Sequence, residues 1–272
     1  QDRQDQAGSG KGDKMKKAIL ILLCAALPGM SLASGGGHLK LDAVKIDLSD
    51  RASLQRGART FVNYCLSCHS ASYMRYNRMG EDLGISEELV KGNLMFAADK
   101  TGELMKASMS KEDAKKWFGT APPDLSLVAR SRGPEWFYTY MRSFYRDEKS
   151  STGWNNTVFP SVAMPHVLFD VQGLQRAVYR TEKHESESVK DGKKVKKVTE
   201  EKVFDRFEIE KPGSMTAQQY DESMRDLTNF MVYLGEPAKL VRHQIGIMVL
   251  VFLAIFFVVA YLLKKEYWKD VH

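Results

Sequence analysis

Two uninterrupted apolar stretches dominate the hydropathy pattern, one near each end of the sequence. The C-terminal stretch, Ile245–Leu263, holds 19 residues without a charge. At roughly 1.5 Å per residue it makes about 28 Å of helix, which is close to the hydrocarbon thickness of a bilayer. Lysines, a tyrosine and a tryptophan follow it, as expected at a cytoplasmic end. We therefore expect residues 243–263 to span the membrane and residues 264–272 to form a cytoplasmic tail.

The N-terminal stretch, Ala18–Leu27, has the flanks of a secretory signal peptide. Met15–Lys17 supplies a basic start, and Ser31–Ala33 supplies the small residues of a cleavage site. A buried core helix is the alternative, but a short apolar run with these flanks favours export. We expect residues 15–33 to be a signal peptide and residues 1–14 to be an unstructured upstream extension.

Between these stretches, four segments carry apolar residues at helical spacing. They are Ser53–Cys68, Lys111–Phe118, Pro134–Tyr145 and Thr216–Leu234, the last of which begins with the capping-box sequence Thr-x-x-Gln. The first and last of these helices are expected to cross closely. Gly57 on one permits close backbone approach to the aromatic residues on the other.

The segment Thr181–Lys202 differs from its surroundings. It has seven lysines, six acidic residues and almost no large apolar residue, so it cannot bury a core. We expect a solvated loop, with a hairpin around Asp191–Gly192 as the alternative.

Charge and length narrow the classes of function. The chain has 272 residues, of which 43% are hydrophobic, enough for one main domain, here residues 34–240. The formal net charge of +6 falls to +2 in that domain, which has 31 Lys and Arg against 29 Asp and Glu. No basic stripe with interleaved aromatic residues is present, so a nucleic-acid partner is not expected.

The chemistry is concentrated in Cys65-Leu66-Ser67-Cys68-His69, since Cys24 leaves with the signal peptide. The pattern C-x-x-C-H is the attachment signature of c-type haem. Two thiols one helical turn apart can each add to a vinyl group of one porphyrin, and the following histidine can bind the iron. A thioredoxin-like redox pair would need a strand-helix-strand setting, and a zinc site would need two further ligands at short spacing.

Haem iron in an electron carrier needs a sixth ligand, and a thioether raises its potential. Met164 is the candidate, because Pro160 and Pro165 hold an irregular loop that can present one side chain. His166 is a rival ligand two residues further on. Four other methionines lie at helical apolar spacing and are expected to fill the core: Met95, Met105, Met109 and Met141.

Together these features resemble the cytochrome c1 family over nearly the whole chain after the signal peptide. Besides the haem motif, the resemblance is carried by Trp117–Ser126, Val128–Gly133, the Met164–Pro165 loop and the tail Tyr261–Lys269. It implies a mainly α, class I cytochrome c-like haem domain with insertions, plus one C-terminal transmembrane helix.

The resemblance also implies the site residues. His69 and Met164 would be the axial ligands of one covalently attached haem c, and the backbone at Pro123 would pack beside the histidine. Arg132 would pair with a haem propionate, which a guanidinium can do bidentately. Arg130 could serve the same purpose.

By the same resemblance, the chain would have no independent catalysis. It would be the electron-transfer subunit of a quinol:cytochrome c oxidoreductase in the cytoplasmic membrane, with its haem domain in the periplasm. The implied partners are a cytochrome b subunit, a Rieske iron-sulfur protein and a soluble or membrane-tethered cytochrome c, in a dimeric complex.

Two other functions stay open at this point. One is a stand-alone membrane-tethered cytochrome c. The separation of 95 positions between His69 and Met164 argues against it. The other is a haem-free thiol-disulfide protein. The near-neutral domain also departs from the acidic docking surface of animal members of the family, so the electron acceptor is not specified.

Overall fold

The computed structural model describes residues 40–190 and 193–271. The expected signal peptide, residues 15–33, and the upstream extension, residues 1–14, lie outside the described residues. The helices are α2 (Arg51–Tyr64), α3 (Tyr76–Leu83), α4 (Glu87–Asn93), α5 (Lys111–Phe118), α6 (Val128–Arg132), α7 (Pro134–Arg142), α8 (Phe169–Gln172), α9 (Ala217–Gly235), η1 (Pro237–Leu240), α10 (Arg242–Tyr267) and η2 (Lys269–Val271). The strands are β1 (Ala71–Arg75), β2 (Leu104–Met105), β3 (Phe144–Arg146), β4 (Trp154–Asn156), β5 (Gly173–Lys190) and β6 (Lys193–Pro212).

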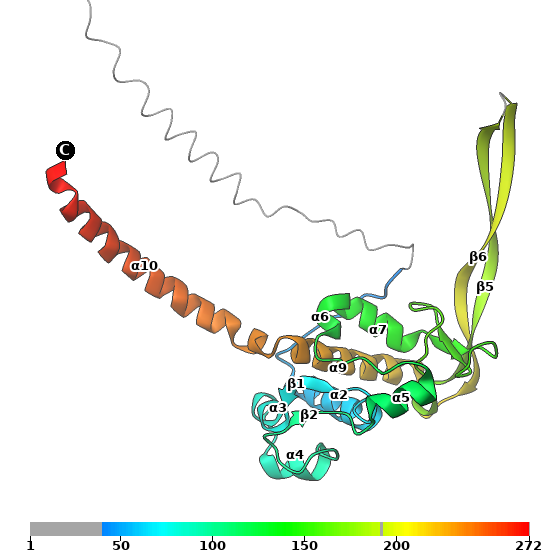
Figure 1. Ribbon diagram of the computed structural model, residues 1–272, viewed down its shortest axis with the longest axis horizontal. Coiled ribbons are helices and arrows are strands. Elements are labelled where there is room, and N and C mark those ends of the chain that lie inside the picture. The colour runs from blue at the N-terminus through cyan, green and yellow to red at the C-terminus, as the bar shows by residue number, and fades with distance from the viewer. Residues whose placement is uncertain (1–39, 191–192, 272) are drawn as a thin grey trace, which may run out of the picture. The chain divides into compact units, whose positions relative to one another are not determined.

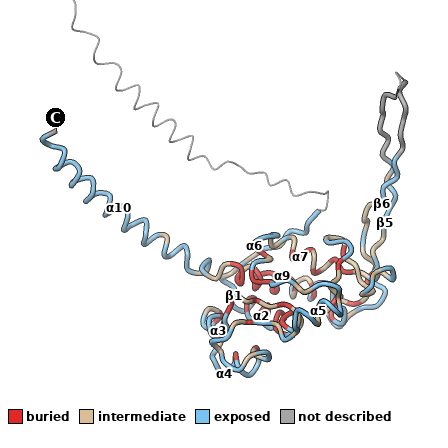
Figure 2. The backbone as a smooth tube through the Cα atoms, viewed as in Figure 1, coloured by how far each residue is buried: buried red, intermediate tan, exposed pale blue. Residues whose placement is uncertain are grey.

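Helices α2 and α9 pack against each other at the centre of the core, where the buried residues gather (Figures 1 and 2). Gly57 lies at their crossing, and a Cβ atom there would lie 2.2 Å from the carbonyl oxygen of Asp226. Phe61 and Phe230 are both fully buried beside it, with ring centroids 5.6 Å apart. The close crossing expected from the sequence is confirmed.

Buried polar groups fix the orientation of this crossing. The Asp226 carboxylate accepts hydrogen bonds from the Ser53 hydroxyl and from Arg56 Nε, both at 2.6 Å. Asn229 Nδ2 in turn donates to the Ser53 hydroxyl at 2.7 Å. Because each buried polar atom here loses its partner if the helices slide, the network selects one register of α2 on α9.

Capping side chains set where two of the predicted helices begin. The Thr216 hydroxyl accepts from the Gln219 amide at 3.3 Å, and Gln219 Oε1 accepts from the Thr216 amide at 2.9 Å. This capping box starts α9 as predicted. Helix α5 has the predicted bounds, with Ser110 as its N-cap.

The two other predicted helices end earlier than expected. Helix α2 ends at Tyr64, because the Cys65 and Leu66 amides both donate to the Phe61 carbonyl and the chain turns. Helix α7 ends at Arg142 rather than Tyr145, because the next residues join strand β3, which pairs antiparallel with β4. The prediction placed Phe144 on a helix, and this was wrong.

The lysine-rich insert forms part of a long antiparallel hairpin, β5 with β6, so the hairpin alternative is confirmed over a loop. The register runs from Gly173 opposite Pro212 to Lys190 opposite Lys193. The predicted turn, residues 191–192, lies outside the described residues. At the base, buried Gln175 donates from Nε2 to the carbonyl oxygens of Arg142 and Phe144, at 3.1 and 2.6 Å.

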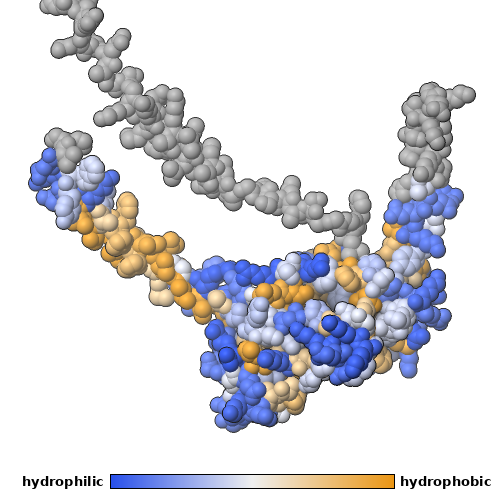
Figure 3. Space-filling view, viewed as in Figure 1, coloured by the Kyte–Doolittle hydropathy of each residue, from blue (hydrophilic) through white to orange (hydrophobic). Residues whose placement is uncertain are grey.

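Helix α10 covers the predicted membrane segment and is long and apolar enough to cross a bilayer, with a mean hydropathy of 3.0 over its most apolar window. None of its residues is buried against the rest of the chain. Figure 3 shows a hydrophobic surface along most of the helix and hydrophilic residues towards its C-terminal end. A helix that is apolar all round is suited to lipid or to partner helices rather than to water.

Candidate functional site

A cavity of about 610 Å³ opens between the α2–β1 connection, α7 and the loop before α8. Its volume lies within the range of about 300–1,000 Å³ that is usual for ligand and cofactor sites. The structure brings all six site residues named from the sequence to its lining: Cys65, Cys68, His69, Pro123, Arg132 and Met164. These residues are up to 99 positions apart in the chain, so the fold and not the sequence order assembles them.

The cysteines lie one turn apart at the end of α2. The Cys68 and His69 amides both donate to the Cys65 carbonyl, at 3.1 and 2.8 Å, which fixes the turn. Both thiols are free, and Cys65 is buried. Burial raises the pKa of the Cys65 thiol to about 12, with the neighbouring Cys68 adding to the effect. The high pKa keeps the thiol protonated. Cys65 lines the cavity.

The His69 ring is oriented by a backbone carbonyl. Its Nδ1 lies 2.8 Å from the oxygen of Pro123. A carbonyl can only accept, so Nδ1 carries the proton, and the lone pair on Nε2 stays available for a metal. Burial lowers the pKa of His69, which favours the neutral ring that a metal requires.

The segment that carries Pro123 is itself held in place by Asp124. The Asp124 carboxylate accepts from the Ser72 amide at 2.9 Å and from the Ser126 amide at 2.8 Å. Burial alone would raise the pKa of this carboxyl, but the hydrogen bonds outweigh it and lower the pKa. Asp124 thus ties the proline segment to β1, which follows the haem motif directly.

Met164 lies in the irregular loop before α8, as predicted. Its Sδ accepts a hydrogen bond from the Tyr140 hydroxyl at 3.5 Å, and both side chains line the cavity. Asn156, which is buried, shapes the loop by accepting from the Val158 and Phe159 amides, at 2.8 and 3.1 Å. A thioether therefore faces the cavity with its neighbours fixed.

His166, the rival ligand, packs away from this cavity and is not among its lining residues. Its ring stacks on Phe144, with centroids 4.9 Å apart, and meets the edge of Trp154 at 5.1 Å. Burial lowers the pKa of His166 to about 4. The histidine serves as a neutral, buried aromatic residue behind the loop.

Arg132 is the arginine that lines the cavity, and the alternative Arg130 does not. The Arg132 guanidinium lies over the ring of Trp136, 5.4 Å from its centroid. Of the four methionines expected to be core, Met105 and Met141 are buried and Met95 is partly so. The prediction was wrong for Met109, which is half-buried and is not part of the core cluster. Met105 lies in strand β2 rather than in a helix, and Met141 lines the cavity.

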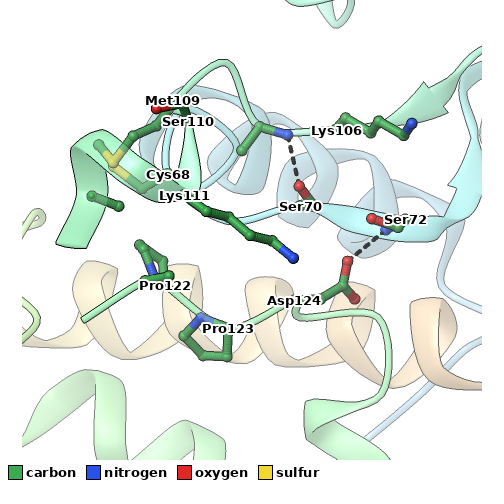
Figure 4. Close-up of a pocket in the computed structure, with 13 residues that line it drawn as sticks. Cys68, Ser70, Ser72, Lys106, Met109, Ser110, Lys111, Pro122, Pro123 and Asp124 are labelled. Atoms are coloured by element: carbon green, nitrogen blue, oxygen red, sulfur yellow. Dashed lines mark hydrogen bonds between the residues drawn. The ribbon is translucent and has the colours of Figure 1, made fainter.

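A second cavity, of about 530 Å³, shares Cys68 and Pro123 with the first (Figure 4). It is more polar, because Ser70, Ser72 and Lys111 line it and do not line the first cavity. Figure 4 shows that Ser70 and Asp124 are already engaged with backbone amides. This cavity offers no sulfur and imidazole pair of the kind that the first one holds.

The donor set of the first cavity fits a c-type haem. Two thiols, one imidazole and the thioethers of Met164 and Met141 line a largely apolar space with one guanidinium beside it. Zinc does not fit as well, because residues 40–190 and 193–271 contain no group of three His, Cys, Asp or Glu side chains that could hold a metal. Sequence reasoning placed Trp136 and Tyr140 on the apolar face of one helix, but it did not assign either residue to the site.

Comparisons with known proteins agree with this chemistry. A model of the cytochrome C1 family matches residues 44–191 and 208–271. Cytochrome c1 of Allochromatium vinosum is 50% identical over 95% of this chain and all of its own. The ammonia monooxygenase gamma subunit of Nitrosomonas europaea is 45% identical over the same shares. A cytochrome b/c1 of Bradyrhizobium diazoefficiens is 25% identical over 82% of this chain and 34% of its own.

Proposed function

Because the chain belongs to the cytochrome c1 family, and so is an electron-transfer subunit of a bc1 complex with one covalent haem c, we propose that the Cys65–His69 motif attaches this haem. His69 and Met164 serve as its axial ligands. The observation that carries the proposal is the convergence of these residues on one cavity from distant parts of the chain.

When bound, haem c supplies one-electron redox chemistry. The protein's part is to hold and tune it. Cys65 and Cys68 provide the thiols for two thioether bonds, while the Pro123 carbonyl keeps His69 in the tautomer that leaves Nε2 unprotonated. Arg132 offers a guanidinium to a propionate. The apolar wall keeps water away from the redox centre, which is one of the levers that set its potential.

The partners follow from this role. The chain, as the redox subunit of a quinol:cytochrome c reductase, accepts an electron from a Rieske iron-sulfur protein and passes it to a soluble or membrane-tethered cytochrome c. The single-pass anchor α10 packs against a cytochrome b subunit in a dimeric complex. Its fully exposed apolar surface supports such packing.

The proposed topology has the haem domain, residues 34–240, in the periplasm and residues 264–272 in the cytoplasm, after removal of residues 15–33. Lysines at the end of α10 support this orientation. A protease added to intact spheroplasts would then digest the haem domain and leave the anchor.

Purification of the membrane complex tests the function. Mild detergent extraction through a tag on this chain is expected to recover a cytochrome b and an iron-sulfur protein, together with quinol-dependent reduction of cytochrome c. Recovery of a lone cytochrome that is functional by itself would favour a stand-alone carrier instead.

The likeness to the Nitrosomonas protein favours a second candidate, a subunit of an ammonia-oxidising enzyme. The same preparation separates the two. Ammonia-dependent oxygen consumption that co-purifies with the chain, without quinol oxidation, would support the second candidate.

A further inference from the structure

Four side chains at a spacing of four form a continuous stack from the end of α6, along α7 and into β3. Arg132 lies over Trp136, and Trp136 stacks on Tyr140 with centroids 5.0 Å apart and planes 9° apart. Tyr140 meets Phe144 edge to face at 5.0 Å. This aromatic stack forms one wall of the cavity through Arg132, Trp136 and Tyr140.

The stack touches the Met164 loop at two places, on opposite sides of Pro165. Within the cavity, the Tyr140 hydroxyl donates to Met164 Sδ at 3.5 Å. Outside it, Phe144 lies flat against the ring of His166, with planes 7° apart. The loop is therefore held at two points: by the hydrogen bond to the Met164 sulfur and by the stacking of Phe144 on His166.

Both the ring and the backbone of Tyr140 are held by neighbouring residues. Its ring is held between Trp136 and Phe144, and its backbone carbonyl accepts from Asn156 Nδ2 at 2.8 Å. Asn156 is the residue that also shapes the loop. One turn of α7 therefore positions both the Tyr140 hydroxyl and, through Asn156, the loop that carries the Met164 sulfur.

We propose that Tyr140 is a positioning residue that orients the Met164 thioether and tunes the reduction potential, with the aromatic stack as its support. This inference rests on the proposed function, because it requires Met164 to be the sulfur ligand. One lone pair of a thioether sulfur engaged by a hydroxyl leaves the other for a metal, so the hydrogen bond selects the direction in which the sulfur donates.

The electronic effect has a definite sign. A hydrogen bond to the sulfur withdraws electron density from it and makes it a weaker donor. Ferric iron depends more than ferrous iron on electron donation from its ligands. A weaker donor therefore destabilises the ferric state more than the ferrous state, and the reduction potential rises. Hydrogen bonding around a ligand is one of the means by which proteins set haem potentials.

The substitution Tyr140→Phe removes the hydroxyl and keeps the ring in the stack. In the detergent-purified complex, we expect the midpoint potential to fall and the charge-transfer band of sulfur-ligated ferric haem to remain. Because the sulfur is then a stronger donor to ferric iron while the ring still supports the loop, we also expect imidazole to displace the thioether about two- to fivefold less readily, as the loss of one weak hydrogen bond implies.

Tyr138→Phe is the matched control, since Tyr138 lies on the same helix, is buried, and contacts Arg142 rather than Met164. If Tyr140→Phe and Tyr138→Phe have the same potential and the same imidazole affinity as the unmodified complex, the proposal is overturned while the sulfur ligand stands. If the unmodified ferric complex lacks the sulfur band, the Met164 assignment fails first, and this inference fails with it.

A second variant tests the outer contact independently. Phe144→Leu keeps an apolar side chain in β3 and removes the ring that stacks on His166. We expect a higher imidazole affinity than in the unmodified complex, because the loop is then held at one place only. An unchanged affinity would show that the stack does not clamp the loop.

Discussion

The imidazole of His69 and the carbonyl of Pro123, 54 positions apart, are joined by a hydrogen bond of 2.8 Å. This contact explains why two consecutive prolines serve a haem motif that lies elsewhere in the sequence. A proline fixes its own backbone and donates no hydrogen bond, so its carbonyl can be presented without competition from regular secondary structure. The contact also places Asp124, the next residue, where it can hold the segment.

Asp124→Asn should loosen the proline segment. The variant keeps the shape of the side chain but loses the charge that strengthens the bonds from the Ser72 and Ser126 amides. We expect the free energy of unfolding to fall by about 1 kcal/mol. The effect is at the low end of the range for hydrogen bonds to charged groups, because the carboxylate is exposed to water. Asp99→Asn is the control, since that carboxyl lies on an exposed loop.

The effect of Asp124 depends on pH in one direction. Its pKa in the folded protein lies below the ordinary value of 3.8, so its contribution is fully present above that pH. It is lost as the pH falls through the folded pKa. Denaturation curves of the protein and of Asp124→Asn should therefore converge below pH 3.8, and a constant difference there would contradict the assignment.

Gly57→Ala should be strongly destabilising. The added Cβ would lie 2.2 Å from the Asp226 carbonyl and 2.7 Å from the Phe230 Cβ, neither of which can move without shifting α9. We expect a cost of about 3 kcal/mol or more, or failure to accumulate folded protein. Thermal unfolding of the purified domain or its level in membranes would measure this.

Gly92→Ala is the matched control for the crossing. Gly92 lies on α4, and nothing is within 4 Å of the position of its Cβ. Because alanine favours helix over glycine by about 1 kcal/mol, this variant should be neutral or slightly stabilising. Equal effects of the two substitutions would show that the α2–α9 crossing does not depend on the glycine.

Met164→Leu should separate the sulfur ligand from haem attachment. Leucine has a similar volume but no sulfur, so Cys65 and Cys68 should still bind the haem covalently while the midpoint potential falls. A redox titration of the variant complex and a haem stain of the denatured chain measure the two effects. An unchanged potential would move the search to another methionine.

Much of the helical framework could be read from the sequence, because it depends on local signals. The capping box at Thr216, the bounds of α5 and the membrane-length helix all follow from residues close together in the chain. The ends of α2 and α7 could not be read in this way. They are set by a shared acceptor at Phe61 and by pairing of β3 with β4, which are contacts that helical spacing does not encode.

Some site residues could likewise be predicted from local sequence, whereas others depend on tertiary contacts. Cys65, Cys68 and His69 form a contiguous motif, and Met164 stood out by its proline-flanked loop. The position of His166 behind that loop, and the hydrogen bond from Tyr140 to the sulfur, depend on how α7 packs on the loop. Only the fold shows that one of two neighbouring potential ligands faces the cavity.

Shortening the β5–β6 hairpin should leave the haem domain intact. Thr181 and Lys202 face each other in the ladder, so residues 182–201 can be replaced by Asn-Gly, which suits a two-residue hairpin turn. The match to the family leaves out residues 192–207, of which residues 193–207 lie in strand β6. We expect normal haem attachment and an unfolding temperature within a few degrees of the original.

The base of the hairpin, unlike its outer part, should contribute to the stability of the haem domain. Gln175→Ala removes the buried amide that bonds the Arg142 and Phe144 carbonyls, and should cost about 1–3 kcal/mol. Loss of the haem domain on shortening, or tolerance of Gln175→Ala, would contradict this division of the hairpin.

The central claim is that one haem c is bound through Cys65 and Cys68 between His69 and Met164. A redox-titrated optical spectrum of the complex purified through this chain tests it most directly. We predict a c-type haem that titrates as a single one-electron centre, shows the sulfur band when oxidised, and is accompanied by separate b-type haems. A complex without covalently bound haem, or a c-type haem without sulfur ligation, would contradict the claim.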